Sequence, residues 1–230
     1  VDATTFQPQM IGDMSSGLSN QSLTDLAVDK DGKMVGITRD KLYSIDTNTG
    51  AVTLVKELTG AATNLTSLSY VPKDVNDPNS EDILVSANAS GDVIQIDPAN
   101  GTATVLGNYG MSGNEQISSS GDIVAVRMLN GNVAGVYATV NIGTDRTKDY
   151  FAQLDPTSGW KARPIATGTG YGKIFGLGFW AGKFYGFVDG GTGAGTIISL
   201  DKDTGKGAVL KAGTIEWYGA GVTTDAPILE

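Results

Sequence analysis

Residues Ile45-Asp46-Thr47-Asn48-Thr49-Gly50 form a motif that recurs along the chain and decides its fold. An apolar residue precedes an Asp, and a Gly follows four positions after that Asp. An Asp side chain accepts hydrogen bonds from turn N–H groups, and Gly readily adopts the positive φ that closes such a turn. Each copy therefore predicts a tight turn between two strands. The other copies are Ile96–Gly101, Leu154–Gly159 and Leu200–Gly205.

The sequence around each motif predicts four short antiparallel strands. Around the first motif, Lys41–Ile45 and Ala51–Val55 form a hairpin pattern, and a second pair, Leu23–Val28 and Lys33–Thr38, lies upstream. The motif aspartates at 46, 97, 155 and 201 are 51, 58 and 46 positions apart. Four-stranded repeats of about this length are typical of propeller blades. The equivalent upstream pairs are Leu65–Tyr70 with Ile83–Ala87, Asp122–Val126 with Val136–Val140, and Ile174–Phe179 with Lys183–Phe187.

The two ends of the chain predict a fifth blade. Val1–Ile11 aligns with Ile45–Val55, with Phe6 in place of the Gly, and Trp217–Val222 resembles the inner strand Ile174–Phe179. Sharing one blade between the ends would close the ring and hide open sheet edges. We therefore predict an all-β fold, a five-bladed β-propeller with four-stranded blades, as a single domain over residues 1–230. Few residues follow Val222, so this blade is expected to be short of one strand.

Composition excludes several classes of function. The 230-residue chain has no Cys and no His, which removes disulfides, thiol nucleophiles, His-based catalysis and the commonest zinc ligands. A net charge of −9 disfavours nucleic acids and anionic membranes as partners. No apolar run is long enough to span a membrane. We expect no cofactor and a monomer.

Three stretches carry a family resemblance: Ser119–Val124, Phe175–Gly182 with Tyr185–Phe187, and Trp217–Pro227. They resemble uncharacterised exported proteins of myxobacteria, many of them of lipoprotein type. The resemblance implies a secreted bacterial propeller of extracellular, periplasmic or outer-surface location, whose signal peptide is removed. Members often carry cysteines, whereas this chain has none. The resemblance defines no functional residue.

The innermost strands predict a ring of side chains around the propeller axis. Two carboxylates in such a ring suggest glycoside hydrolysis, in which two acids flank the scissile bond. The other interpretation is a water-filled channel with hydrogen-bonded polar groups. Equivalent positions on the five inner segments are Asp25, Ser67, Asp122, Gly176 and Gly219.

Irregular loops gather on the face opposite the Asp turns, and loops on a rigid scaffold often carry binding sites. Candidate ligand-binding residues on this face are Tyr109, Arg146 and Tyr171, together with Trp217. Trp180, Trp217 and Tyr218 fit either a carbohydrate-stacking platform or packing between blades.

Acidic loops raise the question of calcium. Asp29–Gly32 and Asp201–Gly205 resemble the start of a calcium loop, but Thr38 and Lys211 stand where the closing carboxylate is needed. Asp74–Asp82 is richer in oxygen ligands and fits either calcium or a solvated turn. We assign no metal ligand.

Three functions remain. The first is an exported, non-enzymatic binding or scaffold propeller that recognises a protein or glycan through its irregular loops. The second is a carboxylate-based glycoside hydrolase or lyase with its site in the channel. The third is a purely structural module.

Overall fold

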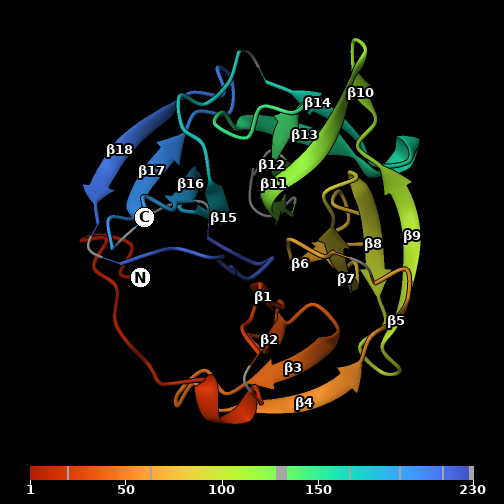
Figure 1. Cartoon of the computed structure of the whole chain (residues 1–230), viewed down its shortest axis with the longest axis vertical. Coiled ribbons are helices and arrows are strands. Elements are labelled where there is room, and N and C mark those ends of the chain that lie inside the picture. The colour runs from red at the N-terminus through yellow and green to blue at the C-terminus, as the bar shows by residue number, and fades with distance from the viewer. Residues whose placement is uncertain are drawn as a thin grey trace.

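Four twisted antiparallel sheets stand around a common axis, like the blades of a propeller, in the computed structural model (Figure 1). The structure describes residues 1–19, 21–62, 64–127, 134–165, 167–191, 193–213 and 215–227. The strands are short and rich in apolar residues, and tight turns join them. The prediction of an all-β propeller is confirmed.

Each blade runs from an inner strand to an outer strand. The first contains β1 (Asp25–Val28), β2 (Met34–Ile37), β3 (Lys41–Ile45) and β4 (Val52–Glu57). The second contains β6 (Ser69–Pro72), β7 (Asp82–Ala87), β8 (Asp92–Ile96) and β9 (Thr102–Asn108), with β5 (Thr59–Gly60) parallel to β9. The third contains β11 (Glu115–Val126), β12 (Gly135–Ile142), β13 (Tyr150–Asp155) and β14 (Lys161–Pro164), with β10 (Met111–Ser112) paired to β11. The fourth contains β15 (Ile174–Trp180), β16 (Lys183–Val188), β17 (Thr196–Leu200) and β18 (Gly207–Ala212). Two short 3₁₀ turns are η1 (Ser15–Gly17) and η2 (Pro156–Ser158).

The fifth blade is not confirmed. Residues 1–19 and 215–227 lie between the fourth and first blades, in a space that we call the fifth sector (Figure 1). Neither segment forms a strand in its described part. Beyond Val222 the chain runs below the axis, where Thr224 binds Asp82 and Asp225 pairs with Arg127, so it does not turn back as a second strand.

The Asp motifs form the turns that the sequence predicts. At Asp46, the Asp N–H donates to the carbonyl of Ala51, and the Gly50 N–H donates to the carbonyl of Asp46. The same pair of bonds recurs at Asp97 and Asp201. The third motif differs, because Pro156–Ser158 forms η2 and the Trp160 N–H donates to Asp155. The closing glycines Gly50, Gly101, Gly159 and Gly205 all have positive φ, between 66° and 77°.

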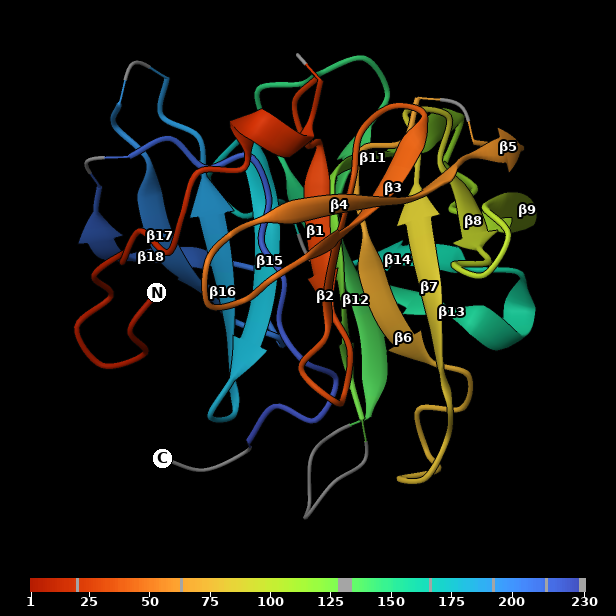
Figure 2. The same cartoon turned by 90° about the horizontal axis from the view of Figure 1, so that it is seen from below.

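Antiparallel direction separates two ends of the ring. The Asp turns and the β6–β7 loop lie at one end, which we call the turn rim, and the described C-terminal end lies there too (Figure 2). Loops between blades and between second and third strands lie at the other end, the loop face.

Apolar cores fill the spaces between neighbouring blades. Leu42, Leu84 and Ile96 belong to the core between the first and second blades. Val85, Ile117 and Trp160 belong to the next core, and Tyr137, Phe151 and Phe184 to the one between the third and fourth blades. On both sides of the fifth sector, the described residues form no comparable core cluster.

Candidate functional site

The predicted axial residues do come together on the inner strands. Asp25, Ser67 and Asp122 are almost completely buried. A Cβ on Gly219 would collide with the Asp25 carboxyl group, and one on Gly176 would press on Ala220. Glycine at these two positions therefore allows the inner segments to approach the axis closely.

Two carboxyl groups join all five inner segments. Asp25 accepts hydrogen bonds from the N–H groups of Leu26 at 2.8 Å and Leu68 at 2.7 Å, and its carboxyl group lies against Gly219 of the C-terminal segment. Asp122 accepts from its neighbour Ile123 at 2.6 Å and from Leu177 of the fourth blade at 3.2 Å. Asp25 and Asp122 are also hydrogen-bonded to each other. The axis is thus closed by a polar plug, which we call the axial carboxyl pair.

A carboxyl pair joined in this way must hold a proton. Burial raises the pKa of Asp25 and of Asp122 well above the usual range. Their shared bond lowers the pKa of Asp25 and raises that of Asp122. The two carboxyl groups therefore titrate as one unit, which keeps a shared proton above the usual pKa range.

The axial carboxyl pair does not have the geometry of a glycosidase. Such enzymes keep their two carboxyl groups about 5–9.5 Å apart so that substrate or water fits between them. A direct hydrogen bond leaves about 2.5–3 Å between the oxygens. Side chains exposed by only 3% and 1% also give substrate no access.

The remaining candidates divide between interior and loop face. Ser67 accepts a bond from the Ala87 N–H at 2.8 Å, and Tyr109 is 1% exposed within the core of the second and third blades. Burial, followed by the charge of Asp122, raises the pKa of Tyr109. Tyr171 is partly buried against Gly207. Only Arg146 is exposed, and its guanidinium binds Ser118 and Asn141 of its own blade.

Sequence reasoning missed Asp149 beside Arg146. Its buried carboxylate accepts from the Ile174 N–H at 2.7 Å and from Asn141 Nδ2 at 2.6 Å, which ties the third blade to the fourth. Burial raises the pKa of Asp149, although these hydrogen bonds oppose the rise. An Asp at the start of an apolar strand was the available signal.

The acidic loop Asp74–Asp82 holds a guanidinium from its own chain. Arg127 is fully buried, and its Nη1 donates to the carbonyls of Asp77 and Pro78 at 3.4 Å and of Ser80 at 2.7 Å. Its Nη2 lies 2.5 Å from Asp82 Oδ1, and its Nε lies 3.1 Å from Asp225 Oδ1. The cation among these oxygens is therefore the guanidinium group of Arg127. Within the described ranges, no group of three or more acidic side chains is arranged to hold a metal ion.

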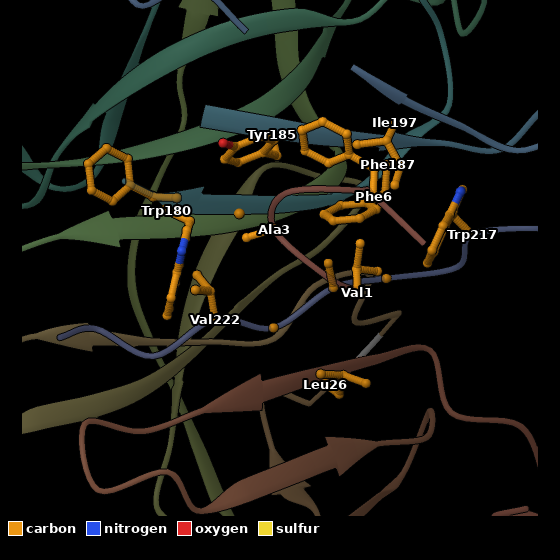
Figure 3. A pocket seen from close by; sticks show the side chains of 15 residues that line it. Val1, Ala3, Phe6, Leu26, Trp180, Tyr185, Phe187, Ile197, Trp217 and Val222 are labelled. Carbon is orange, nitrogen blue, oxygen red and sulfur yellow. The ribbon is translucent and has the colours of Figure 1, made fainter. Parts of the chain in front are cut away.

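A cleft of about 490 Å³ opens in the fifth sector, where the fourth blade faces the terminal segments (Figure 3). Leu26 of β1, Val1 near the N-terminus and Val222 near the C-terminus complete its walls. None of its lining side chains is charged. Its aromatic lining consists of Phe6, Phe179, Trp180, Tyr185, Phe187 and Trp217.

Of the candidate ligand-binding residues, Trp217 lines this cleft, together with Trp180 and the axial Gly219. The ring of Trp217 lies 5.0 Å from that of Phe187, and Phe6 lies 6.0 Å from Tyr185 between centroids. Trp180 lines the cleft and is 39% exposed, whereas Tyr218 is 63% exposed and binds Glu216. These three aromatic residues therefore do not form one flat platform.

These features define a β-propeller with a closed axis and an aromatic cleft beside its terminal segments. No family model and no curated protein matches the chain. No helix in the described part of the chain is long and apolar enough to cross a bilayer.

Solved structures show similarity at low identity. One is described as "Structure of Dos1 propeller", with 13% identity, a TM-score of 0.45 and coverage of 86% of this chain and 50% of that chain. Another is Kuenenia stuttgartiensis hydrazine synthase, with 15% identity, a TM-score of 0.46 and coverage of 84% and 49%. The chain spans about half the length of these two. A puromycin hydrolase shows 17% identity, a TM-score of 0.46 and coverage of 82% and 28%.

Proposed function

We propose that this protein is a non-enzymatic binding propeller whose ligand site is the fifth-sector cleft. The observation that carries the proposal is the aromatic lining of this cleft beside a closed axis. Ligand pockets are typically concave, mostly apolar and about 300–1,000 Å³ in volume. The cleft has this size and character.

The cleft replaces the loop face in this proposal because the loop-face candidates already bind their own chain. Arg146 is engaged with Ser118 and Asn141, and Tyr171 packs on Gly207. The terminal segments, which the sequence assigns to a fifth blade, act here as walls of the binding site.

Extracytoplasmic location is part of the same proposal. It is supported by the acidic composition and by the resemblance to exported proteins. Fractionation of cells that express the native gene, with immunodetection of each fraction, tests the location; a purely cytoplasmic protein would contradict it.

Nile red, a neutral dye that fluoresces in apolar sites, tests the cleft directly. We expect saturable binding to the wild type and an affinity loss of about tenfold or more in Phe187→Asp, because the new charge would lie in the cleft. Leu54→Asp is the matched control, since Leu54 is 49% exposed on the distant strand β4. Equal binding by both variants would exclude the cleft. Oligosaccharide turnover that is lost in Asp122→Asn would instead establish an enzyme.

A further inference from the structure

Aromatic side chains are concentrated in the fifth-sector cleft. The chain has 3 Trp, 8 Tyr and 6 Phe residues, and six of these rings line this one cleft. In Figure 3, Trp180 and Trp217 lie on opposite sides of the cleft, and Phe6, Tyr185 and Phe187 lie between them. Aromatic rings attract other rings beyond the area that they bury, through edge-to-face and offset-stacked contacts. These walls therefore favour a flat ring over a flexible chain.

The cleft offers little to a charged or sugar-like molecule. Among the described residues that line it, no side chain is charged, and none belongs to Asn, Gln, Ser or Thr. A charge that enters such a site without a partner costs free energy, and so does each hydroxyl that loses water without gaining a hydrogen bond. The side chains of the cleft therefore disfavour both ions and sugars.

Polar groups do occur in one wall of the cleft, and they belong to the backbone. Gly219, Ala220 and Gly221 line the cleft, and a Gly can present only backbone atoms. Within the described parts of the chain, no backbone–backbone hydrogen bond involves residues 217–222, because they belong to no sheet ladder. In mostly apolar pockets, a few backbone N–H and C=O groups fix the orientation of the ligand. A neutral ligand can therefore pair with this wall along one edge.

We propose that the fifth-sector cleft binds a flat, uncharged heteroaromatic molecule that carries C=O and N–H groups along one edge. This inference rests on the proposed function, because it names the ligand class of the same site. The rings of such a molecule pack against the aromatic walls, and its edge bonds to the Gly219–Gly221 backbone. The volume of about 490 Å³ suits a molecule of drug-like size.

Lumichrome is the probe, because it is a neutral, fluorescent, flat ring system with C=O and N–H groups along one edge. We expect saturable fluorescence anisotropy with the wild type and with Leu54→Asp, and an affinity loss of about tenfold or more in Phe187→Asp. Lumichrome that is methylated at both edge nitrogens loses its donors and should bind about tenfold more weakly. Equal affinity for the methylated compound would overturn the pairing with the backbone wall.

A second variant tests the ring contacts without placing a charge in the cleft. Trp180 is 39% exposed, so Trp180→Leu should fold while it removes one aromatic wall. We expect the affinity for lumichrome to fall about twofold to tenfold in this variant. Decanol, a flexible aliphatic alcohol, should compete with Nile red at least about tenfold more weakly than lumichrome does. Equal competition by decanol, or unchanged lumichrome affinity in Trp180→Leu, would overturn the preference for a flat ring.

The outcomes separate this inference from the proposed function. Nile red binding in the cleft that lumichrome does not displace would reject this ligand class and keep the site. Absence of binding by both dyes would reject the site itself. A neutral oligosaccharide that displaces Nile red more strongly than lumichrome does would assign the cleft to glycans and overturn the proposal.

Discussion

Asp25 and Asp122 are buried aspartates on the axis, and both oxygens of each carboxyl group accept a backbone N–H. Asp25 accepts from Leu26 and Leu68, and Asp122 accepts from Ile123 and Leu177. In either Asn variant the amide NH₂ would therefore face a donor whichever way it turned. At pH 7 we expect Asp25→Asn and Asp122→Asn each to cost about 3 kcal/mol. Urea unfolding followed by Trp fluorescence measures both, and a loss below about 1 kcal/mol in either variant would contradict this role.

Arg127 links three separate parts of the ring. Its guanidinium binds the β6–β7 loop, Asp82 and Asp225, and it is fully buried at the end of β11. Arg127→Met leaves Asp82 without its cation, and we expect a loss of about 3–5 kcal/mol in the free energy of unfolding. Arg163→Met is the control, because Arg163 is exposed and its guanidinium donates to Gln153. A loss no greater than in the control would refute this role.

The same residue makes a prediction about calcium. Since Arg127 already supplies the positive charge among the loop oxygens, neither Ca²⁺ nor EDTA should shift Tm by more than about 1 °C. Differential scanning fluorimetry with millimolar Ca²⁺ measures this. A clear upward shift would show that a cation site exists elsewhere on the protein.

At the scale of single elements, the Asp turns differ in how closely they meet the neighbouring blade. Gly101 has φ of 77°, and a Cβ there would collide with the carbonyl of Glu57, whereas nothing lies near such a Cβ on Gly159. We expect Gly159→Ala to cost about 1–2 kcal/mol for its φ alone. Gly101→Ala should cost at least about 1 kcal/mol more, because the first and second blades must separate. Urea midpoints compare them, and equal costs would contradict the close contact.

Turns and strands were predictable because their chemistry is local. An Asp that binds the N–H groups two and three residues ahead needs no distant partner, and Asp46 and Asp201 both do so. The fifth blade was not predictable in the same way. A segment such as Gln7–Ile11 becomes a strand only where another strand lies beside it, and sequence alignment with Ala51–Val55 does not supply that neighbour.

The candidate site was less accessible to sequence reasoning than the fold. Equivalent positions correctly placed Asp25 and Asp122 at the axis, but periodicity gives no distance between two carboxyl groups. Arg127 gave no signal at all, because the oxygens that it binds lie 45 or more residues away along the chain, on either side of it. The aromatic cleft is lined by residues from distant parts of the chain, from Phe6 to Trp217, so no single motif in the sequence encodes it.

At the scale of the whole molecule, stability should depend on pH in two opposite ways. Above about pH 4 the unfolded carboxyl groups, with an ordinary pKa of 3.8, release a proton that the axial carboxyl pair retains when folded. The free energy of unfolding therefore falls as pH rises toward the raised pKa, by up to about 1.4 kcal/mol per pH unit for one proton. Asp122→Asn should flatten this slope.

Below about pH 4 the exposed turn aspartates act in the other direction. Backbone hydrogen bonds lower the pKa of Asp2 and Asp46, so stability that is present above pH 4 is lost as they are protonated. Thermal unfolding between pH 3 and pH 8 should therefore show a maximum on the acidic side of neutrality. A stability that rose steadily to pH 8 would contradict the raised pKa of the pair.

Both ends of the described chain lie in one sector, and this decides how the ring responds to force. Tension applied between the termini would act directly across the contact of Ala220 with Asp25, and not along a blade. Few hydrogen bonds resist it there, whereas three apolar cores hold the other blades together. A molecule pulled by its two ends would therefore open first at the contact between Ala220 and Asp25.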